Sequence, residues 1–473
     1  MNIFLIILFV FLIFSIIIIA IFEHSNVKKF FYWTTICVIF PVLGFIVYVI
    51  FGNNLKFQAK QKLMLMHKST KNYISKTDWY NSYVSQNNYI NQTARTIKNK
   101  YKIDIWHNNS IKLFLNGKDF VDDLILEIRN AKNTINLEFY IFSNDSTGNI
   151  VANELIAKAK QGVVVNIVYD AVGCKKTQKK FWDRLLKNNI NVYPFFPNII
   201  NKPIINFKIN HRNHRKIVVI DGKIGYTGGI NIRNDHLGIK TKLKPWRDTQ
   251  IKIKGSGCYS LQEIFLNDLS FACDKDYTKS EIKIYFPPIK NYGKHSCIIA
   301  ESGPEKDIPY IYEIYSYIIN SCKEFLYIQS PYFIIDNNLT NDIINAKNRG
   351  VKVKIIIPKK PDKKLVYGAS LLCIKKLLFN DIDIYLYEGF IHAKTICTEL
   401  VASIGSCNFD YRSFYLNFEN ACLLFDKKDI NINKLIFEND INNSIYLTKK
   451  KFNNIKIKNF LYIFIIKIIS KLL

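Results

Sequence analysis

The stretch HRKIVVID occupies residues 214–221, and a second stretch of the same pattern, HAKTICTE, occupies residues 392–399. Each reads His, any residue, Lys, four residues and then an acid. Each is followed by a turn of small residues and an asparagine, GGIN at residues 228–231 and GSCN at residues 405–408. Side chains two positions apart on a β-strand point to the same face of the sheet. Each copy therefore presents an imidazole and an ammonium group together.

The sequence before each motif is repeated as well. An apolar run at residues 135–142 is followed by a helical stretch and a valine-rich run at residues 163–169. The second copy has the same order, with runs at residues 325–333 and 351–357. Strand, helix and strand in this order indicate βαβ units. We therefore predict an α/β fold of two similar lobes, with mixed sheets flanked by helices, packed pseudo-symmetrically.

Two apolar segments open the chain. Residues 2–22 carry no charge and are long enough, at about 1.5 Å per residue, to cross a hydrocarbon layer of about 30 Å. A cleaved signal peptide is disfavoured because the segment lacks a basic start and a small-residue cleavage site. Residues 30–51 form a second uncharged segment that contains Pro41 and Gly44. We predict a transmembrane helical hairpin over residues 1–52.

The lysines around these segments predict the orientation in the membrane. Only Lys28 and Lys29 lie in the short connection, whereas four lysines follow the second segment: Lys56, Lys60, Lys62 and Lys68. The positive-inside rule then places the large C-terminal part in the cytoplasm of a multi-pass protein of the cell membrane. The ten cysteines show no C-x-x-C pair and no zinc spacing, which fits free thiols in a reducing compartment.

The remaining boundaries follow from composition. We expect a connector at residues 53–110, the first lobe at residues 111–285, the second at residues 286–430 and a basic tail at residues 431–473. Within the tail, residues 459–469 read as an interfacial amphipathic helix or, at comparable odds, as a buried core helix. The net charge of +28 favours nucleic acid or an anionic membrane as a partner. The chain is also rich in Ile, Asn and Lys overall, so a general residue bias accounts for part of this charge.

These motifs resemble those of the phospholipase D superfamily and, within it, the bacterial cardiolipin synthase group. The resemblance covers nearly the whole chain. It rests on the paired His-Lys motifs, on Trp246-Arg247-Asp248 between them, and on NFDYRS at residues 408–413. A single His-x-Lys string is a weak signal, but two copies with matching flanks are specific.

The resemblance implies a two-step exchange in which one histidine forms a phosphohistidine and the other transfers protons. We assign His214 as the nucleophile and His392 as the acid and base, with the order less secure than the pair. Lys216, Lys394, Asn231 and Asn408 would bind the substrate phosphate. No metal or other cofactor is expected.

Four acids complete the predicted site. Asp221 and Glu399 end the two motifs and are counted with the catalytic residues, although the second motif has Glu where Asp is usual and its hairpin is one residue shorter. Asp248 and Glu419 resemble the family's carboxylates that orient the histidines, and we expect them to serve His214 and His392 respectively.

We expect structural roles, or no role in the site, for the other polar residues in and around the motifs. Arg215, Arg247 and Arg412 lie in the motif segments and can bind phosphate or brace the motifs through ion pairs, of which we expect the second. Glu138 and Tyr140 are expected to pack the sheet rather than reach the cleft. The histidines outside the motifs are given no role: His67, His107, His236 and His295.

Membrane attachment favours lipid chemistry. The resemblance implies that a phosphatidyl group passes between two phosphatidylglycerol molecules, with release of glycerol and no nucleic-acid partner; the oligomeric state is left open. A membrane-bound phospholipase D that uses water shares every motif. A nuclease is favoured by the charge but disfavoured by the apolar segments. A non-catalytic lipid-binding protein is disfavoured because both His-Lys pairs are intact.

Overall fold

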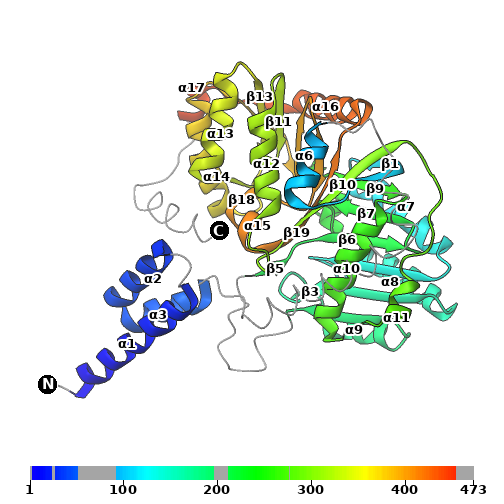
Figure 1. Cartoon of the computed structure of the whole chain (residues 1–473), viewed down its shortest axis with the longest axis horizontal. Helices are drawn as coiled ribbons and strands as arrows, with labels where there is room; N and C mark the ends of the chain where they lie inside the picture. Colours follow the sequence, from blue (N-terminus) through cyan, green and yellow to red (C-terminus); the bar gives the residue numbers. More distant parts are fainter. Residues whose placement is uncertain (1–2, 24–26, 52–91, 197–210, 276, 454–473) are drawn as a thin grey trace. The chain divides into compact units, whose positions relative to one another are not determined.

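The computed structural model describes residues 3–23, 27–51, 92–196, 211–275 and 277–453 (Figure 1). The N-terminal helices belong to one compact unit and the two repeats to another, and each unit is described by itself. Most of the predicted connector and the predicted helix at residues 459–469 lie outside the described residues.

The N-terminal unit contains α1 (Ile3–Glu23), α2 (Val27–Ile39) and α3 (Pro41–Phe51). Among the described helices, α1 alone is long and apolar enough to cross a membrane, over Ile3–Ala20. The second predicted span, residues 30–51, lies over two shorter helices, because the apolar segment is broken before Pro41. Proline has no N–H to donate and its ring clashes with the preceding turn.

The two short helices fold back on each other. The ring centroids of Trp33 and Tyr48 lie 5.3 Å apart, although 15 positions separate them. A Cβ atom at Gly44 would lie 2.7 Å from the carbonyl oxygen of Ile36, so the close approach requires glycine at this position. With 13 and 11 residues, α2 and α3 are each about 20 Å long or less, which is short of a hydrocarbon layer.

The second unit is built on a 16-stranded mixed sheet (Figure 1). The strands of the first half run from the edge to the middle in the order β4-β3-β2-β6-β7-β9-β1. In chain order they are β1 (Trp106–Phe114), β2 (Thr134–Phe139), β3 (Val164–Asp170), β4 (Asn191–Phe195), β6 (Lys216–Ile220), β7 (Ile224–Gly228) and β9 (Gln250–Lys254).

The second half repeats this order as β14-β13-β11-β16-β17-β19-β10, with β20 (Ser444–Tyr446) added at its edge. In chain order its strands are β10 (His295–Ser302), β11 (Phe325–Gln329), β13 (Lys352–Pro358), β14 (Asp383–Tyr387), β16 (Thr395–Thr398), β17 (Ala402–Gly405) and β19 (Asn417–Leu424). The halves join where β1 and β10 pair antiparallel. Each position in one half thus has a counterpart in the other.

Helices cover both faces of each half. In the first half they are α7 (Gly117–Asn130), α8 (Ser146–Lys160), α9 (Lys179–Leu186), α10 (Cys258–Cys273) and α11 (Lys279–Lys283). In the second half they are α12 (Tyr310–Ser321), α13 (Asn337–Asn348), α14 (Lys364–Leu378), α15 (Tyr411–Tyr415), α16 (Lys427–Asn442) and α17 (Lys449–Asn453). The helix α6 (Gln92–Tyr101) precedes β1 in the chain, yet Ala94 and Ile97 pack into the core of the second half.

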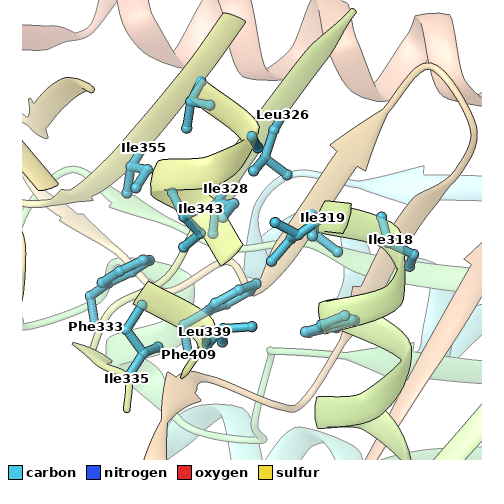
Figure 2. Close-up of a cluster of buried hydrophobic side chains, with 14 of the residues drawn as sticks. Ile318, Ile319, Leu326, Ile328, Phe333, Ile335, Leu339, Ile343, Ile355 and Phe409 are labelled. Carbon is cyan, nitrogen blue, oxygen red and sulfur yellow. The ribbon is translucent and has the colours of Figure 1, made fainter. Parts of the chain in front are cut away.

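Alternation along the central strands separates the two faces. On β11, Leu326 and Ile328 enter the large core under α12 and α13, which Figure 2 shows in close-up. Phe325 and Tyr327 point the other way and pack with residues of α16. Such two-sided burial is typical of a sheet covered by helices on both faces. The predicted α/β fold of two similar lobes, with mixed sheets flanked by helices, is confirmed.

Candidate active site

Two-residue strands bring the motif histidines together from opposite halves. His214 follows β5 (Arg212–Asn213), which pairs in parallel with the start of β19. His392 follows β15 (Phe390–Ile391), which pairs in parallel with β8 (Trp246–Arg247). The backbone N–H of His214 donates to the carbonyl oxygen of Phe418 at 3.0 Å, and that of His392 donates to the carbonyl oxygen of Arg247 at 2.6 Å.

This pairing decides which carboxylate each histidine meets. His214 Nδ1 lies 2.8 Å from Glu419 Oε1, and His392 Nδ1 lies 2.7 Å from Asp248 Oδ2. The sequence-based prediction had the partners the other way round and is wrong on this point. In parallel register the residue after β5 lies beside the residue after Phe418, and the residue after β15 lies beside the residue after Arg247. Each histidine is therefore held by an acid of the opposite half.

Burial sets the protonation of both rings. The two carboxylates are fully buried, whereas the histidine side chains keep 12% and 10% exposure, so the ring edge away from each carboxylate is the one left accessible. Burial lowers the pKa of His214 to about 4, against the opposing charge of Glu419. Burial, followed by the charge of Lys394, lowers the pKa of His392 well below its ordinary value. Both rings are neutral near pH 7, with Nδ1–H donated to a carboxylate and Nε2 carrying a lone pair.

The carboxylates remain ionised despite their burial. Burial alone would raise the pKa of Asp248, but His392 and Lys394 outweigh it, and the pKa falls below its ordinary value. The pKa of Glu419 is lowered in the same way by His214 and Lys216, against burial. Each acid can therefore hold a neutral ring in one tautomer and stabilise an imidazolium that forms during reaction.

The two motif lysines lie within each other's electrostatic reach. Burial, together with repulsion from Lys394, lowers the pKa of Lys216 to about 7, against the opposing charge of Glu419. Burial likewise lowers the pKa of Lys394 to about 8. Each ammonium group donates to the carbonyl oxygen of its own motif histidine. Two cations brought this close favour an anion between them, because an anion relieves their repulsion.

The two asparagines that follow the motifs differ in their surroundings. Asn231 Oδ1 accepts from the backbone N–H of Ile141 at 3.1 Å, and its Nδ2 faces Nε2 of His236 at 3.3 Å. Asn408 is also buried, but its Oδ1 has no hydrogen-bond partner among the described residues. A buried polar atom without a partner is costly, and a bound ligand can satisfy it.

The acids that end the motifs lie at the other end of the strands. Asp221 accepts hydrogen bonds from the backbone N–H groups of three consecutive residues, Lys132, Asn133 and Thr134. Glu399 accepts in the same way from residues 323–325. The structure therefore corrects the inclusion of these two acids among the catalytic residues: each anchors the chain entering the neighbouring strand. The longer Glu399 spans the same gap as Asp221.

Two of the motif arginines brace the fold, as expected. Arg215 is fully buried and pairs with Asp268 and with Glu301, the latter at 3.0 Å. Arg247 pairs with Asp440 at 2.9 Å. These ion pairs fix the segments that carry His214 and Asp248, since a buried guanidinium holds planar acceptors in one geometry.

Two further side chains lie against the motif histidines. Tyr140 was expected to pack the sheet, but its ring centroid lies 4.8 Å from that of His214. His236 was given no role from the sequence, yet its ring centroid lies 5.0 Å from that of His392, and its Nδ1 lies 3.6 Å from Asp248 Oδ2. The signal that could have identified His236 is its place five residues after Asn231, within the turn that continues the first motif.

Two groups of side chains bring metal-ligating atoms within 4.8 Å of one another. One consists of His236, Asp248 and His392, and the other is the separate set His295, Asp426 and Asp429. In each group a His–Asp hydrogen bond of 2.7 Å accounts for the closest approach. We assign no metal to either group.

This geometry suits transfer of a phosphoryl group. Two neutral imidazoles, each tied to a carboxylate, can act as nucleophile and as proton carrier. The two lysines and the asparagine amides can stabilise negative charge on the non-bridging oxygens.

Comparisons with known proteins agree with this geometry. The family model "Cardiolipin synthase, PLD-like domain" matches residues 124–242 and 315–441, one segment in each half. The chain is 36% identical to the cardiolipin synthase of Listeria monocytogenes serotype 4a over 442 residues, and this alignment covers 90% of each chain. It is 35% identical to that of Staphylococcus aureus over 91% of this chain and 88% of the relative.

Among solved structures, phosphatidylserine synthase of Haemophilus influenzae superposes with a TM-score of 0.59 at 15% identity, over 81% of this chain and all of that chain. This likeness shows the fold alone. The relatives at 35–36% identity and the paired domain matches show the family: the chain belongs to the cardiolipin synthases with phospholipase D-like domains.

Proposed function

We propose that the chain transfers a phosphatidyl group from one phosphatidylglycerol molecule to a second, giving cardiolipin and glycerol. The observation that carries this proposal is the pair of neutral histidines, each held by a carboxylate of the opposite half, beside two buried lysines. The family relationship supports the same substrate class.

In the first step, Nε2 of His214 attacks the phosphorus of the donor. A P–N bond forms, and the P–O bond to the glycerol headgroup breaks. His392, as imidazolium, gives its proton to the departing glycerol oxygen, and Asp248 stabilises that imidazolium beforehand. The phosphodiester charge favours protonation of a nearby ring. The products are free glycerol and a phosphatidyl group on His214.

In the second step, the acceptor is a glycerol hydroxyl of another phosphatidylglycerol. Neutral His392 takes the hydroxyl proton while the oxygen attacks phosphorus. The P–O bond forms, the P–N bond breaks, and His214 returns to its neutral state with Nδ1–H still donated to Glu419. Protons balance, because His392 donates one in the first step and recovers one in the second.

Four side chains stabilise the negative charge on the transferred group. Lys216 and Lys394 supply positive charge from the two halves, and Asn231 and Asn408 supply amide groups. We propose that Nδ2 of Asn408 donates to phosphate and that its unpartnered Oδ1 accepts from a substrate hydroxyl. Such groups stabilise the transition state because they are in place before charge develops.

The membrane arrangement is proposed from α1 and the lysines. Lys28 and Lys29 follow α1 directly, and further lysines follow α3. The positive-inside rule places everything after α1 on the cytoplasmic side. This orientation does not depend on a second spanning helix.

The test is a product analysis of membranes that carry the chain or its His214→Ala variant, supplied with phosphatidylglycerol. We expect cardiolipin and free glycerol with the unaltered chain only. His295→Ala is the matched control, since His295 lies in the separate His–Asp pair. Phosphatidic acid as the main product would instead identify a hydrolase, and cleavage of DNA at low salt would identify a nuclease. Unchanged cardiolipin output from His214→Ala would overturn the assignment.

A further inference from the structure

His236 is buried next to the predicted acid and base but belongs to neither motif. It lies in the short 3-10 helix η1 (Asn234–Leu237) and is 4% exposed. Its ring centroid lies 4.6 Å from that of Trp246 and 5.0 Å from that of His392. Burial lowers the pKa of His236, against the opposing effect of Asp248, so the ring is neutral near pH 7.

The hydrogen bonds around His236 select one tautomer. Asn231 Oδ1 accepts from the backbone N–H of Ile141, which leaves Nδ2 as the donor that faces His236 Nε2 at 3.3 Å. Nε2 must then be the acceptor, and Nδ1 carries the proton.

The proton on Nδ1 faces Asp248 Oδ2 at 3.6 Å. The backbone N–H of Asn231 also points at Nδ1 at 3.3 Å, and this tautomer leaves that donor facing another donor. The opposite tautomer would accept it, but would set the Nδ1 lone pair against the carboxylate and Nε2–H against Nδ2 of Asn231. The charge of Asp248 therefore decides the tautomer.

We propose that His236 is a positioning residue for the acid-and-base half of the site: it accepts from the amide of Asn231 and directs Nδ1–H toward the carboxylate of Asp248, 3.6 Å away. The inference deepens the proposed function and rests on it. Through Asn231 the ring would orient a phosphate ligand, and through Asp248 it would fix the carboxylate that holds His392. One side chain thus connects phosphate binding to proton transfer.

Among the described residues, the carboxylate of the second half has no histidine equivalent to His236. Glu419 meets Ser406 through Oε2, and its Oε1 lies 3.3 Å from Nδ2 of Asn417. Those groups are held by β19 and the turn before it, whereas Asp248 relies on the backbone N–H of Thr249 for its other oxygen. The carboxylate of the first half therefore depends more on a side chain outside the motifs.

The test compares His236→Gln with His236→Phe. An amide can donate through Nε2 and accept through Oε1, so the Gln variant keeps an acceptor for Asn231 and a donor toward Asp248, whereas the Phe variant keeps the ring volume against Trp246 and loses both polar contacts. We expect kcat/KM for cardiolipin formation in phosphatidylglycerol vesicles to stay within about threefold for Gln. For Phe it falls roughly tenfold or more, the factor that corresponds to a lost buried hydrogen bond.

A role in packing alone predicts the opposite order, since Phe fills the site better than Gln. A Phe variant with unchanged kcat/KM, or a Gln variant as impaired as Phe, overturns the proposal. His236→Leu replaces the Phe variant if that one does not fold, with the same expectation. The same pair of substitutions at His295 is the control and should leave kcat/KM unchanged.

Failure of the proposed function can be told apart from failure of this inference. If the unaltered chain releases phosphatidic acid in place of cardiolipin, the acceptor was wrong. The Gln and Phe variants are then compared on hydrolysis. A tenfold difference still supports the positioning role, and equal rates overturn it.

Discussion

The two halves of the active site share one framework but differ in what surrounds each histidine. In both, a two-residue strand leads to the histidine and pairs in parallel with the two residues just before a carboxylate of the other half. The His214 side is lined by Tyr140, and its acid is held by Ser406. The His392 side is lined by Trp246 and His236. Duplication provides two imidazole–carboxylate pairs, and the neighbours allow them to take different roles.

Removal of either histidine is expected to lower kcat more than any other substitution considered for the two halves. We expect His214→Ala and His392→Ala each to lower kcat for phosphatidyl transfer by at least roughly 10³-fold. The variants should differ with a nitrophenyl phosphodiester, whose leaving group needs no proton. His392→Ala then still forms a covalent phosphoenzyme, and His214→Ala does not. Acid quenching and mass spectrometry of the histidine peptides measure this; a phosphoenzyme in His214→Ala alone would reverse the two roles.

Loss of a lysine charge is expected to be next in size. Lys216→Met and Lys394→Met each remove one of two cations that face the same anion, so kcat should fall roughly 10²-fold to 10³-fold. The effects should be similar, because burial depresses both pKa values and each lysine belongs to an equivalent motif. Steady-state kinetics on phosphatidylglycerol vesicles test this. A Lys→Arg variant at either position is the matched control, because it keeps the positive charge but changes the shape of the cationic group.

Removing the charge of Glu419 or of Asp248 should shift different limbs of the pH profile of kcat. Glu419 raises the pKa of His214 against burial, so Glu419→Gln lowers that pKa and moves the acid limb of kcat to lower pH. Asp248 raises the pKa of His392 against burial, and His392 must be protonated in the first step. Asp248→Asn therefore moves the alkaline limb to lower pH. Each substitution should also cost roughly 10²-fold in kcat.

A pH profile of kcat for the two variants is the measurement. It also tests the exchanged pairing directly. If the partners were those expected from sequence, Asp248→Asn would move the acid limb and Glu419→Gln the alkaline one.

The sequence predicted the repeat because both copies carry strong local signals. Apolar runs of seven to nine residues and the His-x-Lys spacing identify strands and the paired sites. The exchanged carboxylates could not be predicted, since β5, β8 and β15 have two residues each, too few for any periodicity, and β5 pairs with a strand about 200 residues away. The break at Pro41 was treated as tolerable because composition alone does not distinguish a kink from a reversal.

His236 shows a second limit of the sequence. Its one signal in the chain is its place five residues after Asn231, and the fold of η1 against β8 brings it to Asp248. Asp221 and Glu399 show the converse: they belong to the motifs, and were therefore predicted to be catalytic, but they lie away from the histidines. Strand length places them about five residues from the histidine-lysine end, where they bind backbone N–H groups. Motif membership and active-site membership are therefore different properties.

The smallest expected effect compares these two anchors. Asp221 accepts three backbone hydrogen bonds at 2.7–2.9 Å, whereas Glu399 has one at 2.6 Å and two at 3.3–3.4 Å. Asp221→Ala should lower the free energy of unfolding by about 2 kcal/mol and Glu399→Ala by about 1 kcal/mol. Chemical unfolding of the purified protein in detergent measures both.

Asp221→Asn is the matched control for the stronger anchor. An amide oxygen can still accept from Asn133 and Thr134, which both bind Oδ1, so most of the stability should return. The kcat of the folded variants should equal that of the unaltered chain, because both anchors lie outside the pocket of His214 and His392. A loss of kcat without a loss of stability in Asp221→Ala would return this acid to the catalytic set and show that the two ends of β6 are coupled.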